Sequence, residues 1–371
     1  MNEIVQYIPQ VDPLPLPAPV WLLKLLLIFT FTLHLIPMNI MLGGTVIAGI
    51  SFFKKTDFHR ELARRLTKMI PTIIALTITM GIAPLLFIQV LYGQLFYPSS
   101  IVMAWPWLGV IILVMVAYYL TYLNSFKFSR LNVVKRAIIS WSAVLLLAGV
   151  AFIYSNEMTL MVTPGRWATA YFADSSGLNL NLGEPMLFPR YLHFINGAMA
   201  VAAMFVAMLG LFEKREKWFA KEALQYGARL FMTFTFIQYL LGVLWLISLP
   251  QKMMALFMGR SILASILLLL SIVLSVGAIL MLSKAANTER PTRRVISSMI
   301  SLLFTIVFMA KLRDILRDAY LSPNFNLETA PSSFQASTII PFLILLVGGL
   351  LTVFWMANKF FFPSSESQSA K

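Results

Sequence analysis

Nine long apolar runs constrain the fold of this chain more than any other feature. A membrane-spanning helix needs about 20 mainly apolar residues, and it satisfies its own backbone hydrogen bonds inside the bilayer. Apolar residues make up 59% of the 371 and charged residues 12%, roughly half the charged share of an ordinary soluble domain. The predicted spans are Trp21–Phe53, Met69–Leu95, Pro106–Tyr122, Ile138–Tyr154, Phe188–Leu211, Ala228–Leu249, Ser261–Leu282, Val295–Leu312 and Thr338–Phe360. The sequence therefore predicts an all-α polytopic membrane protein with about nine transmembrane helices.

Lysine and arginine residues gather in every second loop between these runs. The basic segments are 54–68, 127–136, 214–229, 284–294 and 359–371. With nine spans they all lie on one side, which the positive-inside rule assigns to the cytoplasm. We therefore expect the N-terminus outside and the C-terminus in the cytoplasm. The net charge of +14 then reflects topology and attraction to the lipid bilayer, and no nucleic-acid partner is expected.

Composition also divides the chain along its length. Residues 1–20 are rich in proline and predict an extended segment on the outer surface. Residues 21–360 predict a single transmembrane helical domain, and residues 361–371 predict a disordered cytoplasmic tail. The absence of cysteine excludes disulfides, cysteine-ligated iron–sulfur clusters and haem attached through a C-x-x-C-H motif.

Acidic residues are missing from the middle of the predicted spans. Proton pumps and ion-coupled transporters usually keep a carboxylate inside the membrane, so a proton-coupled transporter is disfavoured, while a facilitator or channel stays open. Amides do occur within the spans, and we expect them to form hydrogen bonds between helices. Among them are Asn39, Gln89, Asn196 and Gln238.

Two of the three histidines lie within apolar runs. His34 occurs in LLIFTFTLHLIPMNIMLGG, and His193 opens the run RYLHFINGAMAVAAMF. Neutral imidazoles on different helices at similar depth are candidate ligands of haem iron. The small residues that follow His193 would leave room for a flat macrocycle, or would let helices pack closely. The alternative for each histidine is a simple hydrogen bond between helices, and His59 is expected on the solvated surface.

Four basic residues are expected on the outer side near these histidines. They are Arg190, Lys311, Arg313 and Arg317. Arg313 and Arg317 are four residues apart and share a helix face. Arginine binds carboxylates through two hydrogen bonds, so these residues are candidates for holding haem propionates. The alternative is a salt-bridge cluster in which Asp314 and Asp318 pair with the arginines.

Several stretches resemble the larger, haem-binding subunit of cytochrome bd-type quinol oxidases. LLIFTFTLHLIPMNIMLGGTVIAGISFFKK resembles its first span, and RYLHFINGAMAVAAMFVAMLG resembles its fifth. MGIAPLLFIQVLYGQLFY and FMAKLRDILRDAYL occupy the places of a second-span segment and of an arginine-containing outer motif. The resemblance implies nine spans in the bacterial inner membrane. It also implies one or two b-type haems bound through His34 and His193, and a link to quinone.

The chain departs from that family at three points. The family's oxygen-reducing site uses glutamates in the third and eighth spans, and PWLGVIILVMVAYY and ISLLFTIVFMAK have none. The family's low-spin haem takes a methionine two residues after an arginine, whereas GRSILAS has Arg260 without one, and Met254 and Met258 precede it. The family's long quinol-binding loop is here only the short segment 249–260. These departures put the oxygen-reducing site in doubt.

Three functions follow from these observations. The first is a b-type cytochrome-like subunit that moves electrons between the quinone pool and a periplasmic cytochrome c or other redox subunit, without reducing oxygen. It could belong to a quinol-linked oxidoreductase, and a quinone would contact candidates among Tyr92, Gln89, Gln94 and Trp107. The second is a bd-like terminal oxidase subunit. The third is a haem-free scaffold, assembly factor or facilitator.

Overall fold

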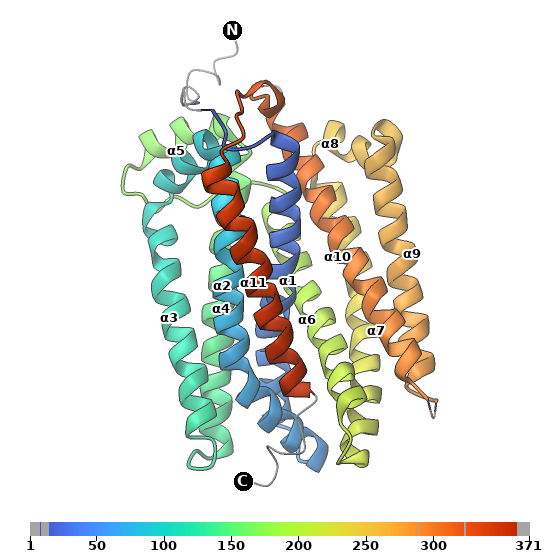
Figure 1. Ribbon diagram of the computed structural model, residues 1–371. Helices are drawn as coiled ribbons and strands as arrows, with labels where there is room; N and C mark the ends of the chain where they lie inside the picture. The colour runs from blue at the N-terminus through green and yellow to red at the C-terminus, as the bar shows by residue number, and fades with distance from the viewer. Residues whose placement is uncertain (1–7, 9–14, 289, 323, 362–371) are drawn as a thin grey trace. The chain divides into compact units, whose positions relative to one another are not determined.

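The computed structural model describes residues 8, 15–288, 290–322 and 324–361, and this part of the chain is all-helical (Figure 1). It contains nine helices long and apolar enough to cross a membrane, as the apolar runs predict. They are α1 (Val20–Phe52), α2 (Asp57–Val102), α3 (Ala104–Phe126), α4 (Val133–Met161), α6 (Leu187–Phe212), α7 (Lys217–Ser248), α9 (Ile262–Ala285), α10 (Thr292–Leu321) and α11 (Ala336–Phe361). Two short helices, α5 (Trp167–Ala173) and α8 (Gln251–Ala255), lie in the connections.

Several helices extend beyond the apolar runs that predict them. α2 begins at Asp57 instead of Met69, where the Thr56 side chain caps it by accepting from the His59 backbone N–H. α4 continues to Met161 instead of ending at Tyr154, and its last residues are buried. Capping and burial against neighbours sustain a helix where the apolar pattern has already stopped, because side-chain polarity alone does not end it.

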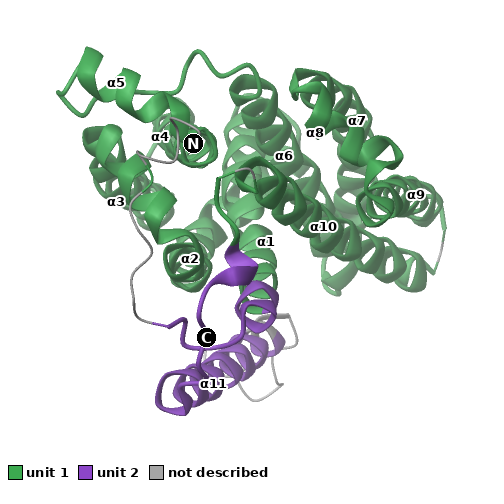
Figure 2. Ribbon diagram, turned by 90° about the horizontal axis from the view of Figure 1, so that it is seen from above, with its two compact units in different colours: residues 1–11, 26–326 green, residues 12–25, 327–371 purple. Residues whose placement is uncertain are grey.

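The chain forms two compact units, shown in Figure 2. Unit 1 comprises residues 1–11 and 26–326, and includes the helices from most of α1 through α10. Unit 2 comprises residues 12–25 and 327–371, in which Leu16 accepts a hydrogen bond from Ser333 and donates one to Pro331. Every candidate site residue lies in unit 1. Residues 362–371 of the predicted tail and most of the predicted N-terminal segment lie outside the described residues, whereas Phe361 is the last residue of α11.

Small residues allow α6 to pack closely against both α1 and α7. A Cβ atom on Gly43 of α1 would overlap the Ala198 carbonyl and the Ala202 side chain. A Cβ atom on Gly227 of α7 would lie 2.5 Å from the backbone nitrogen of Ala207. The small residues after His193 therefore bring helix backbones together, as membrane helices do at such positions. Where Ala198 and Ala202 contact α1, they do not leave room for a macrocycle.

Replacing Gly227 by alanine is expected to destabilise unit 1 by about 1–3 kcal/mol, because backbone atoms on α6 must move to admit the methyl group. Gly44→Ala is the matched control, since a Cβ atom there meets nothing within 4 Å. Denaturation of both variants in mixed micelles measures the effect. Equal stabilities would contradict the close approach of α6 and α7.

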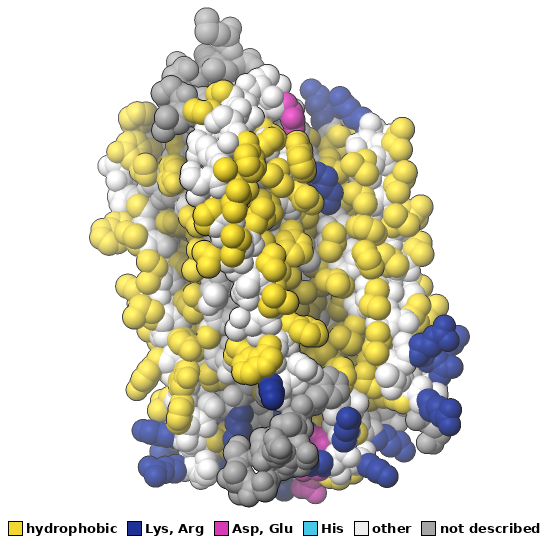
Figure 3. Space-filling view, in the orientation of Figure 1, with side chains coloured by type: hydrophobic (Ala, Val, Ile, Leu, Met, Phe, Trp, Pro, Cys, Tyr) yellow, Lys and Arg dark blue, Asp and Glu magenta, His cyan; other side chains and the backbone are white. Residues whose placement is uncertain are grey.

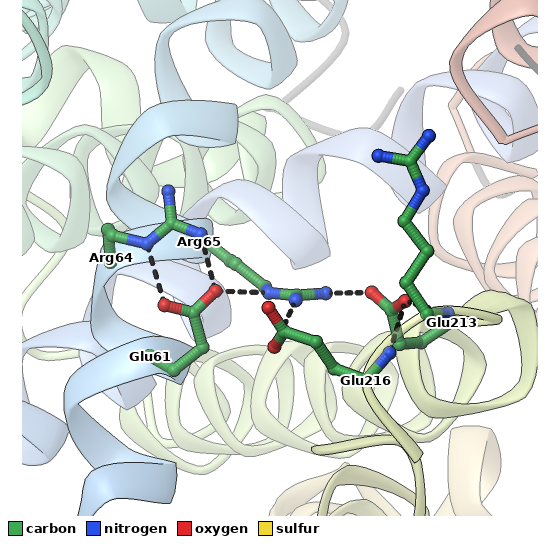
Figure 4. Close-up of polar contacts among 6 residues, drawn as sticks. Glu61, Arg64, Arg65, Glu213 and Glu216 are labelled. Carbon is green, nitrogen blue, oxygen red and sulfur yellow. Dashed lines mark hydrogen bonds and ion pairs between the residues drawn. The ribbon is translucent and has the colours of Figure 1, made fainter. Parts of the chain in front are cut away.

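The basic loops of unit 1 meet at one end of its helices. Arg65 of α2 pairs with Glu61 on its own helix (Figure 4). It also pairs with Glu213 and Glu216, which lie in the connection between α6 and α7. The first and fifth inter-helix loops are therefore neighbours. Figure 3 shows many lysine and arginine side chains near this end, below a flank covered by apolar side chains.

The third and seventh loops join the same end. The Phe128 ring of the third loop lies 6.3 Å from the ring of Phe52, at the end of α1. Gln225 of α7 donates a hydrogen bond of 3.4 Å to the carbonyl of Ala286, just after α9. The prediction that these four basic loops share one side is confirmed, and the direction of that side in the membrane stays a prediction.

Glu213 makes the ion-pair cluster sensitive to pH. Burial raises the pKa of its carboxyl, but the Arg65 guanidinium and the backbone N–H groups of Arg215 and Glu216 lower it more, so the net pKa lies below its usual 4.5. The stabilisation is then fully present above pH 4.5 and is lost as the pH falls through the lower pKa of the folded state.

Glu213→Gln is therefore expected to cost about 1–2 kcal/mol near neutral pH and progressively less in acid. The melting temperatures of wild type and variant, recorded in detergent between about pH 3 and 7, would test this. A difference that stays constant over the whole range would contradict the assigned ion pair.

Candidate functional site

His34 lies in α1 with its ring against α2, and one hydrogen bond decides which ring nitrogen is free. Nδ1 lies 3.0 Å from the carbonyl oxygen of Thr77. A carbonyl oxygen only accepts, so in a neutral imidazole Nδ1 carries the hydrogen and Nε2 keeps its lone pair. Metal-binding histidines are usually oriented by such a contact from the other ring nitrogen. His34 thus has the tautomer and the fixed ring that a metal ligand requires.

His193 lies near the start of α6, with its ring against α7. Its Nδ1 atom is buried and has no hydrogen-bond partner among the described residues. The ring stacks on Trp245 with 6.3 Å between ring centroids, and the indole Nε1 of Trp245 is also buried without a described partner. Buried polar atoms nearly always have partners. The two neighbouring unpaired ring nitrogens therefore fit a binding site whose ligand offers a metal ion or a polar atom.

An amide network holds this part of α6 on α7. Gln238 donates a hydrogen bond of 3.1 Å to the carbonyl of His193. Asn196 donates to the Gln238 side chain at 2.5 Å and to the carbonyl of Phe234 at 2.8 Å. The prediction that Asn196 and Gln238 form hydrogen bonds between helices is confirmed. The network holds the backbone of His193 and leaves the ring atom Nδ1 without a described partner.

Arg313 of α10 interacts electrostatically with His34 and with two further predicted arginines, Arg190 and Arg317. Its guanidinium carbon is 4.5 Å from the ring centroid of Phe31, one turn before His34. Arg190 precedes His193 by three residues, which places the two on one face of α6. The structure therefore connects the His34 side of this region to the His193 side through arginines.

Part of this basic cluster is neutralised by ion pairs. Asp314, 2% exposed, pairs with Arg317 and, at 2.9 Å, with Lys311. Arg317 also donates to the hydroxyl of Tyr92 at 3.0 Å, and that hydroxyl donates to Asp318 at 2.8 Å. The salt-bridge alternative is thus present for Lys311 and Arg317. Tyr92, a candidate for contacting quinone, belongs to this network and is buried.

Arg190 and Arg313 make no ion pair with any residue that the structure describes. Each guanidinium instead faces an aromatic ring, that of Phe194 for Arg190 and that of Phe31 for Arg313. The cluster contains four cationic side chains and two carboxylates, which leaves two cationic charges unbalanced. Partly buried charge without a partner is costly, so the cluster fits a ligand that offers two carboxylates. A b-type haem, with two propionates, has that chemistry.

Glu157 is a buried carboxylate that sequence analysis places outside the spans. In the structure α4 continues past it, and Glu157 is fully buried. Ser99 and Ser100 of α2 donate to its Oε1 atom at 2.7 and 3.1 Å, while Oε2 has no partner in the described chain. In the sequence, Ser99 and Ser100 follow one predicted span and Glu157 follows another. Nothing in that pattern indicates that they are in contact.

The aromatic residues beside Glu157 include another quinone candidate. The Trp107 ring packs edge-to-face on Tyr154 at 5.0 Å and on Phe96 at 5.5 Å. Tyr154 lies one turn before Glu157 on α4. Trp107 is therefore part of an aromatic cluster, and its role toward a quinone stays a prediction.

The segment that carries Met254 and Met258 lies near His193. Phe257, between these methionines, packs on Trp245 with 6.1 Å between ring centroids, and Trp245 stacks on His193. Met258 is 62% exposed. Trp245 therefore lies between this methionine-containing turn and the His193 ring, and the residue two positions after Arg260 is not a methionine.

The comparisons with known proteins concern the fold. No protein-family model matches the chain, and no curated protein matches its sequence significantly. A solved structure, described as the structure of bd oxidase from Geobacillus thermodenitrificans, matches with a TM-score of 0.74 and 14% sequence identity. The match covers 94% of this chain and 99% of the other. The chain therefore has the fold of a bd oxidase subunit, although the two sequences share few identical residues.

Proposed function

We propose that this chain is a membrane-integral b-type cytochrome-like subunit that moves electrons between the quinone pool and a periplasmic redox partner, such as a cytochrome c. In this proposal the chain spans the bacterial inner (cytoplasmic) membrane, with its N-terminus outside and its C-terminus in the cytoplasm. The observation that supports it most is a pair of cationic side chains that no described ion pair balances, Arg313, which acts on His34, and Arg190, which acts on Arg313. The bd oxidase fold supports the same conclusion.

In this proposal the candidate residues divide the work of holding one or two haems b. His34, through Nε2, and His193 would bind iron, and the Thr77 carbonyl keeps the His34 ring in place. Arg190 and Arg313 would bind propionates, while Lys311 and Arg317 hold Asp314 within the same cluster. A bound haem supplies reversible one-electron transfer, and the apolar helices around it exclude water.

Oxygen reduction is not part of the proposal. α3 and α10 are the third and eighth long helices, and neither contains a glutamate. The buried carboxylate of Glu157 lies on α4, where it accepts hydrogen bonds from the α2 residues Ser99 and Ser100.

A haem-free structural subunit is the second candidate, and one observation favours it. The His34 ring lies so close to α2 that a Cβ atom on Gly81 would come within 2.9 Å of its Cε1 atom. Such packing is also what a histidine that merely links two helices would show.

The visible spectrum of the purified protein separates the two candidates. The chain would be purified from membranes of a haem-sufficient host, and reduced-minus-oxidised spectra and the haem content per chain would be recorded. A b-type spectrum with one or two haems per chain is the expected result. A colourless, monodisperse protein would overturn the proposal and leave the haem-free subunit.

A further inference from the structure

A pocket of about 400 Å³ lies where the basic loops of unit 1 meet. It is formed by the end of α1, the starts of α2, α4 and α7, and the loop before α4. Its lining residues with a role below are Ser51, Phe52, Arg60, Arg64, Arg136 and Trp218. The pocket lies beside the basic loops, and none of the haem-site candidates lines it.

Two donors that line this pocket have no acceptor. Ser51 is fully buried, and its hydroxyl has no hydrogen-bond partner among the described residues. The Nε atom of Arg136 is buried and equally without a partner. The Arg136 guanidinium stacks on Phe128 at 3.9 Å, which orients it, and it makes no ion pair in the described chain. A buried hydroxyl and a guanidinium in one pocket are suited to an anionic oxygen acceptor.

The charge of the pocket matches a single phosphodiester. Arg60 is paired with Asp57 and Arg64 with Glu61, so these four side chains balance one another. Arg136 adds one cationic charge without a carboxylate. A phosphodiester carries one negative charge and several acceptor oxygens, which the guanidinium can bind through two hydrogen bonds.

The walls of the pocket indicate that the phosphate belongs to a lipid. Phe52 and Phe128 line it, and Val133 and Trp218 at its rim are 50% and 46% exposed. A soluble phosphate needs no apolar wall, whereas a lipid places glycerol and acyl carbons against one. Basic pockets between membrane helices at the cytoplasmic side are suited to anionic headgroups. We propose that this pocket binds the phosphodiester of an anionic phospholipid.

Native mass spectrometry of the full-length protein in detergent tests this proposal without reference to haem. Wild type, Arg136→Gln and Ser51→Ala would be titrated with phosphatidylglycerol, with phosphatidylcholine and with inorganic phosphate. The matched control is Arg229→Gln, because Arg229 lines a second pocket of about 370 Å³ at the same end of the helices. Arg136→Gln is expected to weaken phosphatidylglycerol binding about 10- to 100-fold, and Ser51→Ala about 3- to 10-fold. Arg229→Gln should leave it unchanged.

Four outcomes would overturn the proposal. Phosphatidylglycerol binding unaffected by Arg136→Gln, or weakened equally by Arg229→Gln, would remove the pocket from consideration. Equal binding of phosphatidylcholine would show that the negative charge is not recognised. Competition by inorganic phosphate at the lipid's own affinity would assign the pocket to a free anion. If Arg136→Gln does not fold, the Ser51→Ala titration alone decides, because the serine carries no charge.

Discussion

His34→Ala and His193→Ala are each expected to remove a b-type haem signal from the purified protein. Alanine takes away the imidazole nitrogen that would bind iron, and the Thr77 contact of His34 is a backbone carbonyl, which supplies no nitrogen in its place. If each histidine binds its own haem, each variant loses about half of the reduced-minus-oxidised signal, whereas a single shared haem is lost completely in both. Haem content per chain measured on the same samples distinguishes these results.

His59→Ala is the matched control for both variants. His59 lies at the start of α2, half-buried between Phe58 and Tyr226, with Nδ1 bonded to the Thr56 hydroxyl at 2.7 Å. It belongs to the opposite end of the helix from the candidate site, and its removal should leave the spectrum unchanged. A coloured wild type whose spectrum survives both His34→Ala and His193→Ala would contradict the assigned ligands.

Asp314→Asn is expected to destabilise the protein by about 3–5 kcal/mol, the range for breaking a buried ion pair on one side. Asp314 is 2% exposed, and Arg317 would lose its carboxylate partner while Arg190 and Arg313 remain nearby. Lys311 would lose the same partner. Denaturation in mixed micelles measures the loss.

Asp57→Asn provides a control with the same spacing and a different exposure. Asp57 pairs with Arg60 three residues later, as Asp314 does with Arg317, but its side chain is 87% exposed. An exposed pair contributes about 0–1 kcal/mol. The double variant Asp314→Leu with Arg317→Met should be more stable than Asp314→Asn, because it removes the charge together with its partner. Equal losses for Asp57→Asn and Asp314→Asn would refute the buried pair.

The long helices and the common side of the basic loops were predictable because both depend on local composition. An apolar run that crosses a membrane is helical because its backbone must satisfy its own hydrogen bonds. A charged loop stays out of the hydrocarbon core regardless of how the helices pack. The ends of helices were less predictable. Thr56 extends α2 by capping and burial extends α4 past Glu157, and neither effect is part of the apolar pattern.

The candidate site divides in the same way. The apolar pattern was enough to place His34 and His193 in membrane helices, and the four-residue spacing was enough to place Arg313 and Arg317 on one face. Three contacts emerged only from the folded arrangement: the Thr77 carbonyl holds His34, Asp314 neutralises Arg317, and Arg136 and Ser51 line one pocket. Those contacts depend on how the helices are rotated and shifted against one another. The packing of small residues such as Gly43 and Gly227 sets that register, and no single segment encodes it.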